Sequence, residues 1–203
     1  MSAANQAVTG EGRLPATLNG LQAPVYWGML VLVAIETVVF ATLLSSYFYL
    51  RLLSDQWPPA GVPNPDLLLP VINTVVLLTS SGMLLWATRA LSQGNQRRLK
   101  IGVGIAIVLE GVFFTIKMVV STGLPFSWSD HAYGSIFASI DRLHSLHVVI
   151  AIVMAVVVEI LAFRGEFDAE RRLGIQVVNI YWQFVALIWL PVFVVLFLVP
   201  RWL

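Results

Sequence analysis

The sequence contains no cysteine among its 203 residues. That absence excludes a disulfide framework, thiolate metal sites and a cysteine nucleophile. Charged residues are also scarce, at 11% of the chain against roughly 25% in soluble domains. The net charge is only +1, and no lysine and arginine run is interleaved with aromatic residues, so nothing predicts binding to nucleic acid. Ser80 and Ser81 have no nearby general base as in a catalytic triad, and no glycine-rich phosphate loop follows a strand.

Hydrophobic residues, by contrast, make up 58% of the chain. They are concentrated in five stretches that approach or exceed the roughly 20 residues needed to cross a bilayer. The sequence therefore predicts an all-α integral membrane bundle of five transmembrane helices. The expected spans are residues 25–50, 67–92, 101–124, 136–163 and 176–200.

The segments outside the spans predict the topology. Residues 1–24 are polar and lack an apolar core followed by a cleavage site, so the first span is expected to direct insertion. Residues 25–203 are expected to form one transmembrane domain. Eight of the twelve lysines and arginines lie on the side of the N-terminus. Because positive loops stay in the cytoplasm, the N-terminus is predicted inside and the C-terminus outside.

Several ionisable residues lie inside these spans, where an unpaired charge costs several kcal/mol. At about 1.5 Å per residue, Glu36 and His147 lie about 16 Å deep and Glu110 about 14 Å deep. His144 and His147 are three residues apart and share a helix face. Lys117 follows Glu110 by seven residues and lies on the same stripe. The three groups near the midplane are therefore expected to converge.

Other polar residues are interpreted as packing and surface groups. The second span carries Asn73 among small polar residues, which let membrane helices approach closely and form hydrogen bonds across an interface. Arg142 lies about one and a half turns inside the outer end of the fourth span. Its long side chain is expected to extend outward and to pair with Asp130 or Asp141.

The buried cluster admits more than one interpretation. Bis-histidine haem ligation is disfavoured because both membrane histidines lie on one helix and axial ligands approach from opposite faces. A di-iron carboxylate site is disfavoured because no Glu-x-x-His motif is repeated on paired helices. Two interpretations stay open. The first is a set of interhelical hydrogen bonds, with Glu36 protonated or bonded to a histidine, and the second is a role in handling protons or lipid.

Five segments, in order, resemble subunit III of the haem-copper terminal oxidases. The similar segments are WGMLVLVAIETVVFATLLSSYFYLR with Glu36, PVINTVVLLTSSGMLLWA, PFSWSDHAYGSIF, HSLHV at residues 144–148 and YWQFVALIWL at residues 181–190. The longer members of that family have seven helices, and this chain resembles a short form without the first two. The family pattern has other residues at Lys117, Val120, Arg142, Ser145, Gln183 and Ala186.

The resemblance implies a subunit with no catalytic site and with no haem, copper or other metal of its own. Haem and copper would lie in the partner, the catalytic subunit I, and a bound phospholipid would fill a cleft between the helices. Glu36 would lie at that cleft, bonded to His144 or His147, with Glu110 and Asn73 as further buried polar candidates. The expected partners are subunit I, other oxidase subunits and membrane lipids, in a bacterial-type inner (plasma) membrane.

Two alternatives remain beside this interpretation. One is a stand-alone small transporter or proton channel that uses Glu36, Glu110, His144 and His147. The other is the equivalent subunit of a nitric-oxide-reductase-type complex.

Overall fold

The computed structural model describes residues 22–168 and 170–202, so most of the expected polar segment 1–24 lies outside the described residues. All regular structure in the described part of the chain is helical. Five long helices are followed by a short π-helical segment and a final helical turn. Their bounds are α1 Pro24–Leu52, α2 Leu68–Ser92, α3 Gln96–Thr122, α4 Ala132–Phe163, α5 Leu173–Phe193, the π-helical segment Val194–Leu198 and α6 Val199–Trp202.

The predicted number of spans is confirmed. Five helices in the described part of the chain are long and apolar enough to cross a membrane, the last running continuously over Leu173–Trp202. Two helices begin earlier than predicted because polar side chains cap them. Asn95 Oδ1 accepts a hydrogen bond from the backbone N–H of Arg98 at 3.0 Å, and His131 Nδ1 accepts one from Gly134 at 2.8 Å.

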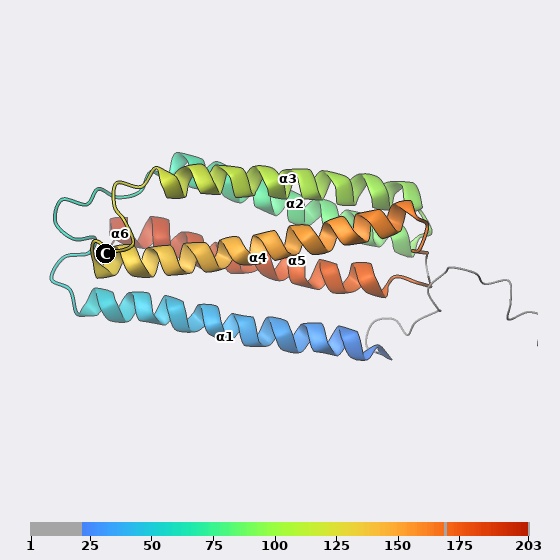
Figure 1. Ribbon diagram of the computed structural model, residues 1–203, viewed down its shortest axis with the longest axis horizontal. Coiled ribbons are helices and arrows are strands. Elements are labelled where there is room, and N and C mark those ends of the chain that lie inside the picture. Colours follow the sequence, from blue (N-terminus) through green and yellow to red (C-terminus); the bar gives the residue numbers. More distant parts are fainter. Residues whose placement is uncertain (1–21, 169, 203) are drawn as a thin grey trace, which may run out of the picture.

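The helices run alongside one another as a bundle (Figure 1). The α1–α2 loop (53–67), the α3–α4 loop (123–131) and the chain end lie together, and we call this the C-terminal end of the bundle. The short loops 93–95 and 164–172 lie at the opposite end. Glycines with positive φ, Gly94 at 76° and Gly165 at 77°, follow α2 and α4 there, a conformation that glycine adopts without steric cost.

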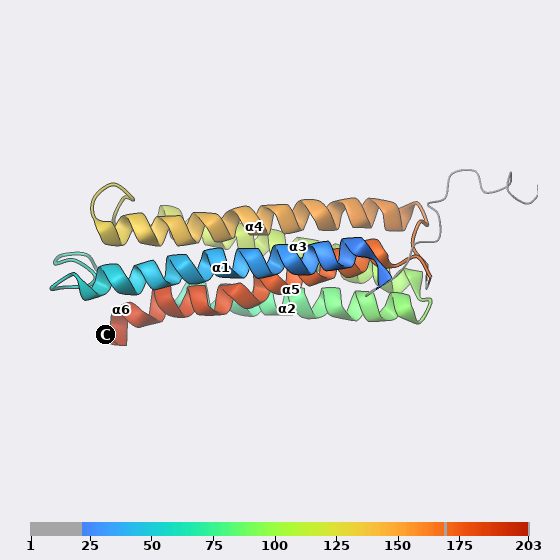
Figure 2. The same cartoon turned by 90° about the horizontal axis from the view of Figure 1, so that it is seen from below.

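Helix α1 is the least buried of the five. Only 11% of its most apolar window is buried, against 56% for α5. It contacts α4 and α5, and it lies along the lower edge of the bundle in Figure 1 and in front of the other helices in Figure 2. Phe40 and Tyr47, both fully buried, attach the C-terminal half of α1 to the other helices. Many of the other large apolar side chains of α1 are exposed, among them Val31, Ile35 and Val38, as expected for a helix that faces lipid.

Helices α2 and α3 form the most extensive contact in the bundle. Small polar residues of α2 bond to backbone groups of α3, since Asn73 Nδ2 donates to the Phe113 carbonyl at 3.0 Å and Ser80 Oγ contacts the Ala106 carbonyl at 3.1 Å. The expected packing role of Asn73 is therefore what the structure shows. Near the opposite end, Gly102 of α3 lies directly against Ala87 of α2.

We expect Gly102→Ala to lower the stability of the protein by about 1–3 kcal/mol through overpacking. A Cβ at this position would lie 2.7 Å from the Ala87 Cβ and 3.3 Å from its Cα, so the two helix backbones must separate. Gly111→Ala is the matched control on the same helix, because no atom lies within 4 Å of its Cβ position. Thermal unfolding of the purified protein in detergent measures the difference, and equal melting temperatures for the two variants would contradict the prediction.

Candidate functional site

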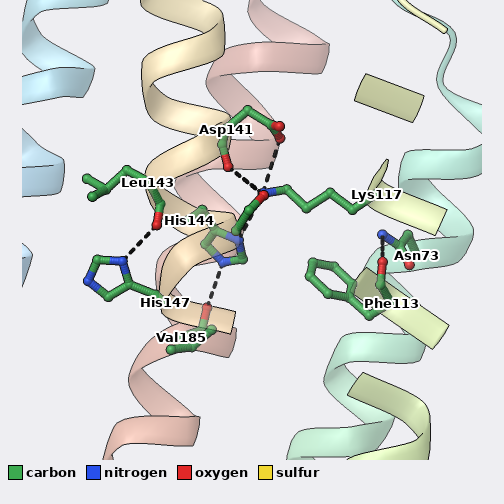
Figure 3. A network of polar contacts seen from close by, with 9 residues as sticks. Asn73, Phe113, Lys117, Asp141, Leu143, His144, His147 and Val185 are labelled. Atoms are coloured by element: carbon green, nitrogen blue, oxygen red, sulfur yellow. Dashed lines mark hydrogen bonds and ion pairs between the residues drawn. The ribbon is translucent and has the colours of Figure 1, made fainter. Parts of the chain in front are cut away.

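Helix α4 carries most of the buried polar side chains. Asp141, His144, Ser145 and His147 follow one another along about two turns and are all buried. Their partners come from other helices, with Glu36 on α1 and Lys117 on α3. We call these six residues the polar cluster; Figure 3 shows the part around Lys117, Asp141 and the two histidines.

The first contact in the polar cluster joins α1 to α4. His147 Nε2 lies 3.1 Å from Glu36 Oε2, and His147 Nδ1 lies 2.8 Å from the Leu143 carbonyl oxygen. Because a carbonyl only accepts, Nδ1 carries a hydrogen, and one further hydrogen must lie between Nε2 and Oε2. Imidazolium with carboxylate and neutral imidazole with carboxylic acid both satisfy this count. Of the two histidines offered by the sequence, His147 is the partner of Glu36.

His144 occupies a different position, although it lies on nearly the same face of α4. Its ring is fully buried, with Nε2 at 3.2 Å from the Val185 carbonyl of α5 and Nδ1 at 3.4 Å from Lys117 Nζ. The carbonyl requires a hydrogen on Nε2, and the ammonium donates toward Nδ1, which together assign the neutral Nε2–H tautomer. The ring also lies 4.9 Å from that of Trp189, centroid to centroid.

The strongest charge interaction is the pair formed by Lys117 and Asp141. Lys117 Nζ lies 3.2 Å from Asp141 Oδ1, and the two side chains are 2% and 4% exposed. The ammonium also donates to the Asp141 carbonyl at 2.6 Å and to Ser145 Oγ at 2.7 Å. Trp189 completes its surroundings, with the ring centroid 5.4 Å from Nζ. Every hydrogen of the ammonium therefore has an acceptor, which a buried lysine requires.

The expected pairing of Arg142 with Asp130 or Asp141 is wrong. Asp141 faces the bundle interior and binds Lys117, whereas Arg142, one residue later, lies on the exposed side of the helix. Consecutive helical residues point about 100° apart, so the two side chains cannot share a direction. Asp130 instead caps its own loop by accepting from the Ser127 backbone N–H at 2.6 Å.

Glu110 does not join Glu36 and His147, contrary to the predicted convergence. It is 1% exposed and lies at the α2–α3 contact, with Oε2 at 3.0 Å from Ser80 Oγ. The Ser80 hydroxyl also contacts the Ala106 carbonyl at 3.1 Å, and it has a single hydrogen for the two. Both contacts are satisfied together when Glu110 is protonated and donates to Ser80. The two glutamates lie at a similar depth along their helices but in different interfaces, Glu36 between α1 and α4 and Glu110 between α2 and α3.

Three interhelical contacts in the structure are not among those predicted from the sequence. Lys117 with Asp141 was detectable, since the sequence places opposite charges inside two spans and charges in hydrocarbon pair. Gln183 bonds to Ser81, whose hydroxyl contacts Gln183 Oε1 and whose carbonyl lies 3.2 Å from Nε2. Trp189 Nε1 donates to Thr74 Oγ1 at 2.8 Å. Nothing in the sequence alone indicated which rotation of α5 would bring these residues toward α2.

The contacts limit what the polar cluster can do chemically. Both ring nitrogens of His147 bond to protein groups, and His144 bonds the Val185 carbonyl through Nε2 while its Nδ1 faces the Lys117 ammonium at 3.4 Å, so protein groups occupy both sides of each ring. Within residues 22–168 and 170–202, no three His, Asp or Glu side chains gather closely enough to hold a metal ion. The arrangement joins α1, α3, α4 and α5 through groups that satisfy one another.

Comparison with known proteins identifies relatives over nearly the whole chain. The family model described as cytochrome c oxidase subunit III matches residues 6–201. Among curated proteins, cytochrome c oxidase subunit 3 of Anopheles gambiae is 31% identical over 179 residues, covering 84% of this chain and 68% of that protein. The protein of the same name from Oryctolagus cuniculus is 30% identical, with coverages of 89% and 70%. That of Thermostichus vulcanus is 29% identical, with coverages of 86% and 87%.

We expect Lys117→Met and Asp141→Leu each to destabilise the protein by about 3–5 kcal/mol, because each leaves one buried charge without its partner. The double variant should lose far less, since two apolar side chains of similar volume replace the pair. Reversible unfolding in mixed micelles, analysed as a double-mutant cycle, measures the coupling. Additive losses in the double variant would show that the two charges do not stabilise one another.

Proposed function

Because the chain belongs to the cytochrome c oxidase subunit III family, we propose that it supports a proton-pumping haem-copper terminal oxidase of aerobic respiration by packing on the catalytic subunit I. It is a non-catalytic subunit of an oxidase complex. The observation that carries the proposal is the match of the subunit III family model to residues 6–201. Haem and copper would then reside in subunit I, and this chain would contribute structure and no redox centre.

The alternatives have less support. A stand-alone transporter or proton channel built on Glu36, Glu110, His144 and His147 is not favoured, because the relatives are named as oxidase subunits. Glu110 is moreover separated from Glu36 and bonded to Ser80, so the four groups do not form one chain of contacts. The same names favour an oxidase over a nitric-oxide-reductase-type complex.

The proposed setting is a bacterial-type plasma membrane, with the N-terminus in the cytoplasm. The loops and adjoining helix ends at the opposite end of the bundle carry seven of the eight positive residues counted on that side, namely Arg89, Arg97, Arg98, Lys100, Arg164, Arg171 and Arg172. Such loops remain in the cytoplasm. The C-terminal end of the bundle would then face outward.

A groove at the opposite end supports a lipid-holding role. It has a volume of about 460 Å³ and lies between α4 and α5, with Val25 of α1 at its edge. Its walls are apolar, and Val153 of α4 and Val177 of α5 are among them. Arg171 and Glu166, in the loop between these helices, also line it, and Arg171 Nε lies 3.5 Å from Asp168 Oδ2. We propose that the groove holds a phospholipid acyl chain against its apolar walls, with the headgroup among the charged residues of this loop.

A bulky residue in the groove tests the lipid proposal. We expect Val153→Trp to reduce the phospholipid retained by the purified assembly, because the indole fills the space of the acyl chain. Leu146→Trp is the matched control on the exposed face of the same helix, since Leu146 is 55% exposed and Val153 is 57% exposed. Native mass spectrometry counts the bound lipids. Equal retention in the two variants would contradict an acyl chain in this groove.

The support function is tested by purification of the assembly. We expect the tagged chain to copurify with a larger haem-bearing subunit, and Glu36→Ala to lower the yield of that assembly or to shorten its activity during turnover. The variant leaves His147 buried without its partner, a loss of about 1–3 kcal/mol. Optical spectra of the copurified fraction and the rate of activity loss are the measurements.

Val38→Ala is the control for this experiment, because Val38 is 65% exposed on the same helix and lies two residues from Glu36. It should behave as the wild type. A haem spectrum from the isolated chain would exclude a purely supporting subunit. Unchanged yield and unchanged inactivation in Glu36→Ala would remove the role proposed for the Glu36–His147 contact.

A further inference from the structure

A small cavity lies beside the Asp141 carboxylate, on the side of the polar cluster that faces the C-terminal end. It is enclosed by α2, α3, α4 and the end of α5, with Phe137 and Trp189 among its apolar walls. Lys117, Ser121 and Asp141 supply polar groups to it, and Asn73 lines it as well. Figure 3 shows the carboxylate directed away from His144 and His147. The cavity volume is about 10 Å³, counted as the space that the centre of a water molecule can occupy.

The Asp141 carboxylate is only half satisfied by the protein. Oδ1 contacts Lys117 Nζ at 3.2 Å, whereas Oδ2 is fully buried and has no hydrogen-bond partner among the described residues. Asn73 Oδ1 is buried and unpartnered in the same sense. A buried carboxylate oxygen without a donor is costly, and native proteins commonly satisfy such atoms with ordered water.

The size and charge of the cavity select the ligand. A cavity needs roughly 10–15 Å³ of such volume to hold one water molecule. This cavity has about 10 Å³, so no larger molecule fits. A cation would be repelled by the Lys117 ammonium and an anion by the Asp141 carboxylate, both of which line the cavity. An apolar occupant would leave Oδ2 without a donor. A small neutral hydrogen-bond donor meets all three conditions.

We propose that this cavity is a binding site for one water molecule, which donates a hydrogen to Asp141 Oδ2 and bonds to the Ser121 hydroxyl. Ser121 follows Lys117 by four residues on α3, so the two side chains lie on the same face of that helix. The water completes the hydrogen bonding of the Lys117–Asp141 pair from the side that the protein leaves open. Nothing in this inference depends on the oxidase role.

A second cavity lies next to the first, and we infer that the water reaches the site through it. It has a volume of about 290 Å³ and lies at the C-terminal end, where Asn64 and Asp66 of the α1–α2 loop help to line it. Pro70 and Val120 line both cavities, so the two are neighbours. The inferred route to the buried ion pair therefore starts at the C-terminal end of the bundle and passes Pro70 and Val120.

A density map of the purified wild-type assembly, at a resolution that shows ordered water, tests the site. We expect a discrete peak about 2.8 Å from Asp141 Oδ2. In Ser121→Ala the peak should disappear or weaken strongly, because one of its partners is removed. Thr115→Val, which removes an exposed hydroxyl of the same helix, should leave it unchanged.

Two results would overturn the site. One is the absence of a peak at Asp141 Oδ2 in a map that shows other buried waters. The other is a direct bond from a protein donor to that oxygen. An undiminished peak in Ser121→Ala would overturn the assignment of Ser121 as the second partner.

The route is tested with cysteine, which the native chain lacks. We expect Val120→Cys to react with a small charged thiol reagent roughly tenfold faster than Thr115→Cys, because thiolate formation requires water. Mass spectrometry of the corresponding peptide in the intact assembly reads the modification. Equal rates at the two positions would exclude a hydrated path past Val120.

Discussion

The structure depends on one constraint, that an ionisable group in the hydrocarbon region must find its partners inside the protein. Helix α4 carries three such groups close together, Asp141, His144 and His147, and they point in different directions around the helix. Each is met by a different neighbour: α3 through Lys117, α5 through the Val185 carbonyl and α1 through Glu36. The polar groups of a single helix therefore specify which three helices surround it and at what height.

This arrangement explains the position of α1, whose apolar side chains give it no preferred face. Lipid is as apolar as its leucines and valines, so burial alone does not hold such a helix to a bundle. Phe40 packs at 5.2 Å from the His147 ring, centroid to centroid, and Glu36 bonds that ring one turn earlier on the same helix. The two contacts fix both the rotation and the depth of α1 at a single point. Toward the opposite end of the bundle, the apolar groove lies between α4 and α5, and α1 contributes only Val25 to its lining.

Most of the fold could be predicted from the sequence, and the pairing within the polar cluster only in part. The five spans follow from hydrophobic runs, because a helix that crosses hydrocarbon needs a fixed length of apolar residues. Depth along each span was also predictable from the helical rise, and it correctly placed Glu36 level with His147. Depth says nothing about rotation, however. The expected convergence of Glu110 with Glu36 and His147 is therefore wrong, and so is the expected pairing of Arg142 with Asp130 or Asp141, since Asp141 faces Lys117.

The buried ion pair is better understood as a device for specificity than for stability. Desolvation of two charges offsets most of their attraction, and apolar residues of the same volume can be equally stable. An apolar pair would pack almost as well if α3 were shifted by one turn along α4. The ion pair would not, because that shift would leave both Lys117 and Asp141 buried without a partner. The close contact of Gly102 with Ala87 sets the distance between α2 and α3, and the ion pair sets the height of α3 against α4. A subunit whose surface must match the other subunits of an oxidase complex needs both to be fixed, and in this bundle the close glycine contact and the buried ion pair fix them.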